Sequence, residues 1–161
     1  MNVRKLAALA GGAVILAAGI AQAQVPQYGN NITLEQAKAV AAAADADAKG
    51  RGWPMAIAIV DTAGLLVYYQ KADGTQNASV LVSQDKAATA ALFRRPTKVL
   101  QDAIAGGGAG LRFLTLNHNT IAVEGGIPLT IGGKIVGAIG VSGMASDQDG
   151  MVAQAGVNAL K

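Results

Sequence analysis

The chain has 161 residues, with 13 Lys and Arg against 10 Asp and Glu, one histidine and no cysteine. This length predicts one domain rather than several. The lack of cysteine excludes disulfides, thiol catalysis and thiolate metal sites. A single histidine also excludes a two-histidine metal motif, and we assign no residue to a metal site.

The N-terminal 23 residues have the pattern of a secretory signal peptide. Arg4 and Lys5 precede an uncharged run over residues 6–20, and residues 21–23 (Ala-Gln-Ala) match a small-x-small cleavage site. The uncharged run is shorter than the ~20 residues that span a bilayer, so a retained membrane anchor is the weaker alternative. We expect cleavage after Ala23 and a periplasmic or secreted protein with no membrane attachment afterwards.

The predicted mature chain is almost neutral. Cleavage removes two of the 13 basic residues, which leaves 11 basic residues against 10 acidic ones. No stripe of Lys and Arg with interleaved aromatic residues is present, so we expect no nucleic-acid partner. Residues 24–31, which contain Pro26 and Gly29, are predicted to form a flexible leader, and residues 32–161 a single domain.

The first predicted elements are a helix and a β-hairpin. Thr33 and Gln36 have the spacing of a capping box, and apolar residues then recur at helical spacing until a glycine ends the helix. Residues 55–60 and 65–70 are short apolar runs on either side of a turn at 61–64. This arrangement is typical of two antiparallel strands.

The middle of the chain predicts two helices and an irregular segment. Residues 79–93 have helical spacing, and this helix ends before Pro96 because the residue preceding a proline avoids the α region. A short helix is predicted over residues 97–104. The glycine-rich residues 106–110 predict a loop, and residues 111–116 fit either a strand or a turn of helix.

A second hairpin and a final helix complete the predicted domain. Residues 127–131 and 135–141 read as strands joined by a Gly-Gly pair, which favours a tight hairpin. The last helix covers residues 146–160, and Asp147 and Asp149 in its first turn suit the helix dipole. Two hairpins indicate antiparallel pairing, so we expect an α+β fold of sheet and helices rather than a Rossmann unit.

Four short stretches carry a resemblance to a known family. They are residues 85–90 (DKAATA), 95–97 (RPT), 124–128 (EGGIP) and 137–143 (GAIGVSG). Through these stretches the sequence resembles the GlcG/HbpS-like family of haem-degrading or haem-binding domains. The resemblance implies a profilin-like α+β fold, in which helices pack on the faces of a central antiparallel sheet of about five strands. It also implies a homo-oligomer, with haem as the cofactor.

One stripe of the predicted second helix carries candidate ligand contacts. It consists of Val82, Lys86, Thr89 and Phe93, at spacings of four, three and four. A lysine on a helix that is apolar on most sides lies at the edge of a buried region, where it is paired or faces a pocket. Alternatively, its stem packs while its ammonium reaches water. The resemblance favours a ligand pocket that includes Lys86, Thr89 and Phe93.

The densest charge cluster of the predicted mature chain follows this helix. It contains Arg94, Arg95 and Lys98, with Thr97 among them. These side chains are suited to charge-assisted hydrogen bonds with carboxylates such as haem propionates. Alternatively, the cations complement the C-terminal end of the helix dipole without any ligand. His118 is a candidate axial ligand because imidazole commonly binds haem iron, or else an exposed loop residue.

The leading interpretation is an exported haem-binding protein, which acts as a carrier, a buffer or a sensor partner, with haem degradation as a further option. One alternative is a small-molecule or protein-interaction module without haem on the same scaffold. Another is an enzyme that acts on a small organic acid or aldehyde, with Lys86 as base or Schiff-base amine. Charged residues make up 14% of the chain, against about 25% in typical proteins, which leaves much surface for a partner copy to cover.

Overall fold

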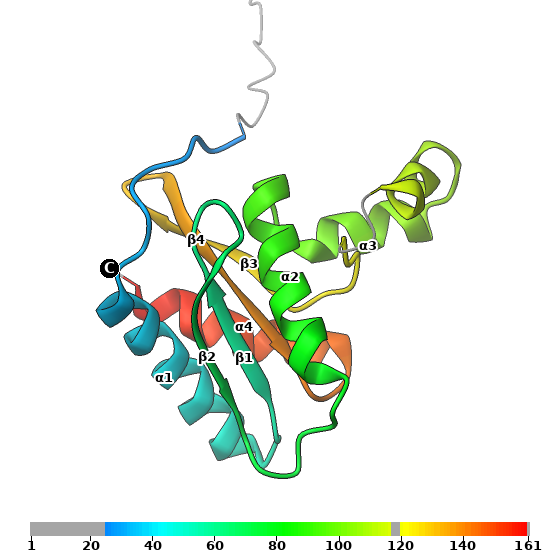
Figure 1. The fold of residues 1–161 in the computed structure, drawn as a ribbon. Coiled ribbons are helices and arrows are strands. Elements are labelled where there is room, and N and C mark those ends of the chain that lie inside the picture. The colour runs from blue at the N-terminus through cyan, green and yellow to red at the C-terminus, as the bar shows by residue number, and fades with distance from the viewer. Residues whose placement is uncertain (1–24, 117–119, 161) are drawn as a thin grey trace, which may run out of the picture.

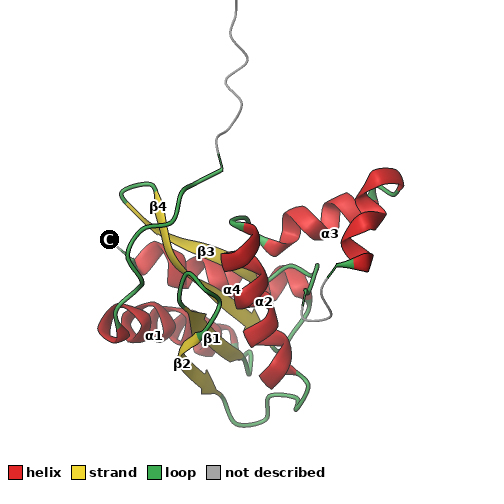
Figure 2. Cartoon of the chain, turned by 45° about the horizontal axis from the view of Figure 1, so that its top comes forward, coloured by secondary structure: helices red, strands yellow, loops and turns green. Residues whose placement is uncertain are grey.

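The computed structural model describes residues 25–116 and 120–160. The bounds in chain order are α1 Leu34–Arg51, β1 Ala56–Val60, β2 Leu66–Lys71, α2 Ser79–Phe93, α3 Thr97–Ala105, the 3₁₀ helix η1 Gly108–Thr115, β3 Gly126–Ile131, β4 Lys134–Ser142 and α4 Ser146–Ala159 (Figures 1 and 2). The predicted α-helices and strands are confirmed, with small shifts at their ends. Within these two described ranges, no helix is both long and apolar enough to cross a membrane.

The strands form one antiparallel sheet in the order β2-β1-β4-β3. Ile59 of β1 pairs with Tyr68 of β2 on one side and with Ile139 of β4 on the other. The expectation of about five strands is therefore wrong for the described residues, whose sheet has four. Residues 111–116, the open candidate for another strand, lie in and after η1, which packs on α3 and has no strand beside it. The α+β class is confirmed, and the profilin-like assignment stays a prediction.

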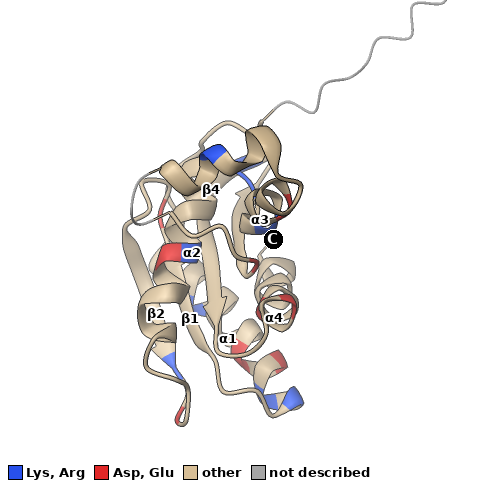
Figure 3. Cartoon of the chain, turned by 90° about the vertical axis from the view of Figure 1, so that its right-hand side faces the viewer, with Lys and Arg blue, Asp and Glu red and all other residues tan. Residues whose placement is uncertain are grey.

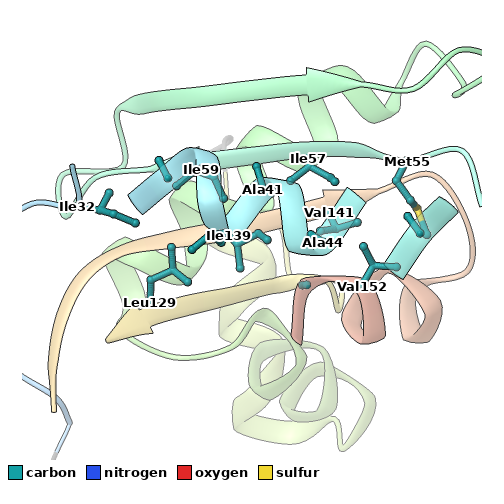
Figure 4. Close-up of a cluster of buried hydrophobic side chains, with 14 of the residues drawn as sticks. Ile32, Ala41, Ala44, Met55, Ile57, Ile59, Leu129, Ile139, Val141 and Val152 are labelled. Atoms are coloured by element: carbon teal, nitrogen blue, oxygen red, sulfur yellow. The ribbon is translucent and has the colours of Figure 1, made fainter. Parts of the chain in front are cut away.

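Helices cover both faces of the sheet. α1 and α4 pack together on one face, whereas α2 lies on the other (Figure 3). The larger core lies under α1 and α4, where Ile57 and Ile139 of the sheet meet Ala44 of α1 and Val152 of α4 (Figure 4). Small alanine side chains on the buried side of α1 allow the helix to approach the sheet closely.

The contact between α2 and the sheet is even closer. Ala58 and Ala138 of the sheet face Ala87 and Ala91 of α2, so the layers are separated mainly by methyl groups. A Cβ atom at Gly140 of β4 would lie 2.5 Å from the Ala87 nitrogen, which no real side chain tolerates. The glycine in the middle of this strand therefore sets the distance between α2 and the sheet.

The predicted flexible leader is anchored from Gln27 onward. Ile135 donates to the Gln27 carbonyl at 2.9 Å, and Gly29 donates to the Ile135 carbonyl at 2.7 Å. The segment can pair there because β1 ends opposite Ala138, which leaves the first residues of β4 without a strand on that side. Tyr28 also reaches α2, where its hydroxyl donates to the Ala91 carbonyl at 3.0 Å. These hydrogen bonds hold residues 27–29 of the predicted leader against β4 and α2, and the flexibility of the leader stays a prediction.

Candidate functional site

Lys86 is fully buried in an ion pair that joins α2 to α4. Its side chain is 2% exposed and that of Asp149 is 3% exposed, with 2.7 Å between Lys86 Nζ and Asp149 Oδ2. The same ammonium donates to the Val141 carbonyl of β4 at 3.1 Å. A buried charge is tolerated only when it is paired and hydrogen-bonded, and this geometry meets both conditions.

Asp149 is held by α4 and by the loop before it. Its Oδ1 accepts the Met144 amide at 3.1 Å, while Oδ2 accepts from Lys86. Burial raises the pKa of this carboxyl group, and the hydrogen bonds from Lys86 and Met144 oppose that rise without cancelling it. The prediction that Asp149 suits the helix dipole from the first turn of α4 did not include its partner Lys86. The available signal was its spacing from Val152 and Gly156, which puts it on the buried stripe of α4.

A pair of glycines forms the wall beside this ion pair. Gly125 has φ +126°, and a Cβ atom there would lie 2.8 Å from Lys86 Nζ. Thr97, which is fully buried, accepts the Gly126 amide through Oγ1 at 2.9 Å. Two of the short stretches that carry the family resemblance, residues 95–97 and 124–128, therefore enclose the Lys86–Asp149 pair. Their structural role explains why these residue types stand there.

This geometry decides between the interpretations of Lys86. The interpretation in which its ammonium reaches water is wrong, because burial extends to the end of the side chain. The expectation that the lysine is paired is confirmed. An amine that is enclosed by protein and bound to a carboxylate cannot attack a substrate, so the structure does not support the Schiff-base alternative.

The rest of the α2 stripe borders two hollows. The first, here called the α2 hollow, has a volume of about 280 Å³ and lies against the turn between β1 and β2. Its lining residues are Val60, Gly64, Leu66, Gln84, Asp85, Ala88, Thr89, Leu92, Phe93 and Thr120. The second, here called the η1 cleft, has a volume of about 540 Å³. It is lined by Val82, Ile104, Phe113, Leu114, Leu116, Thr120, Ile121, Ala122 and Val123.

The two hollows adjoin at Thr120, which lines both. The Ile121 amide donates to Thr89 Oγ1 at 3.0 Å, and this bond fixes the segment from Thr120 to Val123 against α2. Except for Thr120, the residues that line the η1 cleft are apolar. The predicted stripe therefore faces ligand-sized space at Val82, Thr89 and Phe93, but not at Lys86. No sequence signal indicated that Phe113 and Ile121 would form the opposite wall.

The predicted cationic residues do not converge on these hollows. Arg94 is the C-cap of α2, with its guanidinium 5.5 Å from the centre of the Tyr28 ring. Arg95 donates through Nε to the Phe93 carbonyl at 3.0 Å. Lys98 pairs with Asp102 at 2.9 Å and lines a different cavity, beside Gly125 and α4. Arg94 therefore lies at the C-terminal end of α2, as the helix-dipole interpretation expects, whereas Lys98 lies in the first turn of α3 and pairs with Asp102.

The remaining points concern the predicted axial ligand and the binding of metal ions. His118, the predicted axial ligand, lies outside the described residues and stays a prediction. Among residues 25–116 and 120–160, no group of three His, Cys, Asp or Glu side chains is placed to hold a metal ion.

The fold is shared with proteins of known structure. A double mutant of Streptomyces reticuli HbpS matches with a TM-score of 0.75 and 30% sequence identity, over 94% of this chain and 99% of that one. The protein PduOC, crystallised as a haem complex, matches with a TM-score of 0.76 over 81% of this chain and 96% of that one. Its sequence identity is 24%, so this second likeness concerns the fold alone.

The sequence comparison identifies the family. Residues 32–158 match the family described as "Haem degrading protein HbpS-like". The protein GlcG of Escherichia coli strain K12 is 36% identical over 111 residues, which cover 69% of this chain and 81% of GlcG. The chain therefore belongs to the HbpS-like family, and the resemblance first seen in its short motifs is confirmed.

Proposed function

We propose that this chain is an exported haem-binding protein that holds haem in the η1 cleft. The observation that carries the proposal is an apolar cleft of about 540 Å³ in a chain of the HbpS-like family. Clefts that bind cofactors and other small molecules commonly have volumes of about 300–1,000 Å³ and mostly apolar linings with few polar groups. The apolar wall of Val82, Phe113 and Ile121 suits the faces of a porphyrin ring.

The axial ligand in this proposal is His118. None of the described residues that line the cleft is a His, Cys, Met or Tyr, the side chains that bind haem iron. Leu116 and Thr120, the nearest described residues on either side of His118, both line the cleft. This placement supports His118 as the ligand. Thr89 and Phe93 contribute to the adjoining α2 hollow, whereas Arg94, Arg95 and Lys98 line neither hollow.

The proposed role is that of a carrier, buffer or sensor partner, delivered to the cell envelope by the N-terminal signal sequence. The basic residues and the Ala-Gln-Ala sequence at positions 21–23 support export. We assign no catalytic step, because the described residues that line the η1 cleft include no acid or base. Copies of the chain are also proposed to associate, as the low content of charged residues indicated.

A titration of residues 24–161 with haemin, followed by absorbance, tests this proposal. We expect a shifted Soret band that saturates at a fixed stoichiometry, and a changed band for His118→Ala. Val123→Trp should weaken binding because the residue lines the cleft and is 42% exposed. Val99→Trp is the matched control, since Val99 is 46% exposed on α3 and does not line the cleft. A rise that does not saturate, like that of an unrelated protein, would favour the module without haem.

A further inference from the structure

Haem carries two propionate groups, and the walls of the η1 cleft provide no cation to receive them. Apart from Thr120, the described residues that line the cleft are apolar. In the adjoining α2 hollow, the one charged lining residue among those described is an acid, Asp85. An unpaired carboxylate is costly to bury. The propionates of a haem in this cleft therefore belong at its mouth, in water or beside a cation.

The mouth of the cleft lies on the side of η1. Leu114 lines the cleft and is nevertheless 66% exposed, so the cleft opens to solvent at this residue. η1 packs on α3, and together they project from the body of the molecule (Figure 1). A flat apolar ligand can therefore enter the cleft and leave one edge beside η1.

Arg112 is the one basic residue of η1, and it lies next to the cleft wall. Phe113 and Leu114, the two residues that follow it, both line the cleft. The guanidinium carbon of Arg112 lies 4.9 Å from the centre of the Phe113 ring, which is a typical cation–π distance. The ring that forms part of the wall therefore also holds a cation beside the cleft.

The guanidinium of Arg112 has N–H donors to spare. Its side chain is exposed, and none of the ion pairs between described residues includes it. Its Nη1 donates to the Ala109 carbonyl at 3.5 Å, which is longer than usual for a hydrogen bond. Lys98 differs, because its ammonium already binds both carboxylate oxygens of Asp102. An arginine has five N–H donors, and two of them can bind the two oxygens of one carboxylate.

We propose that Arg112 binds one propionate of haem at the mouth of the η1 cleft and makes the site selective for porphyrins with free carboxylates. This inference rests on the proposed function, to which it adds a residue that determines specificity. The edge of the porphyrin without propionates enters the apolar cleft, while the propionate edge stays beside η1. A neutral porphyrin of the same shape would fill the cleft but would lack the bond to Arg112.

The test compares haemin with its dimethyl ester, in which both propionates are neutral. Both are titrated into residues 24–161 in the same mixed solvent and followed at the Soret band. Arg112→Gln should raise the dissociation constant of haemin about five- to tenfold, as expected for a charge-assisted hydrogen bond at an open mouth. It should leave the dissociation constant of the ester unchanged. Arg112→Lys should recover part of the loss, because lysine keeps the charge but not the two-point geometry.

Arg94→Gln is the matched control. Arg94 also lies near an aromatic ring, 5.5 Å from the centre of Tyr28, but it lines neither hollow, so the affinity for haemin should not change. An unchanged haemin constant for Arg112→Gln, an equal loss for both porphyrins, or an equal effect of Arg94→Gln would overturn the inference and leave the proposed function standing. A wild-type protein that does not bind haemin saturably would overturn both.

Discussion

Replacement of Lys86 by methionine should destabilise the protein strongly. Methionine has a similar length and fills the space of the lysine stem, so the change removes the charge without opening a large cavity. Asp149, whose side chain is 3% exposed, would then keep a buried carboxyl group without its cation, and the Val141 carbonyl would lose a donor at 3.1 Å. Loss of one partner of a buried ion pair costs about 3–5 kcal/mol. Domains of this kind have total stabilities of about 5–15 kcal/mol.

The assay is urea unfolding of residues 24–161, followed by circular dichroism. The matched control is Lys49→Met, because Lys49 also pairs with an aspartate, at 2.6 Å, but its side chain is 72% exposed. An exposed pair of this kind contributes about 0–1 kcal/mol. The double variant Lys86→Met with Asp149→Leu should recover most of the lost stability, because a buried pair can be replaced by apolar side chains of similar volume.

A small effect would refute this reasoning. If Lys86→Met lost less than about 1 kcal/mol, the lysine would be behaving like a surface residue. The same result would reopen the interpretation of Lys86 as a pocket residue that is free to contact a ligand. A large loss that the double variant does not recover would instead show that Lys86 acts through contacts other than Asp149.

Three further predictions concern the same region. Gly125→Ala should lower the free energy of unfolding by at least about 1–3 kcal/mol, measured by thermal or urea unfolding. Gly132→Ala is the control and should cost less, because both glycines have positive φ but only Gly125 is enclosed by other atoms. Thr97→Val should cost about 1–3 kcal/mol in the same assay, since it leaves the buried Gly126 amide without an acceptor. The third prediction concerns pH. Because burial raises the pKa of Asp149, its carboxyl group holds a proton more tightly in the folded chain than in the unfolded chain. The free energy of unfolding should therefore fall as the pH rises from the ordinary aspartate pKa to the pKa of the folded state. Asp149→Asn should lack this component of the pH dependence, and an unchanged profile would contradict the raised pKa.

The sequence predicted local elements well because local signals define them. The second helix is an example: its apolar spacing and the following Pro96 predicted residues 79–93, which are the bounds of α2. The pairing of Lys86 with Asp149 was out of reach, since 63 positions separate the two residues and only the packing of α4 brings them together. A single sequence contains no direct measure of such a contact.

Two other differences have the same physical origin. Residues 27–29 pair with the start of β4 because no strand lies beside it there. β1 ends opposite Ala138, so the register of β1 against β4 leaves this edge open. The segment 111–116 could not be assigned because the glycines before it remove local preference, and its conformation depends on packing against α3. Of the predicted site residues, Thr89 and Phe93 line the α2 hollow, whereas none of those that the structure describes lines the η1 cleft. The residues of η1 did not stand out in the sequence.

The most direct test of haem binding in the η1 cleft is a two-dimensional ¹⁵N–¹H NMR spectrum of residues 24–161 with and without haemin. Ferric haem is paramagnetic, so it broadens the amide signals of nearby residues. The account predicts saturable broadening that is strongest at Val82, Phe113 and Ile121, with little change at Met151 and Gln154 on α4. Broadening centred on α4 would contradict this site, and uniform broadening without saturation would contradict specific haem binding altogether.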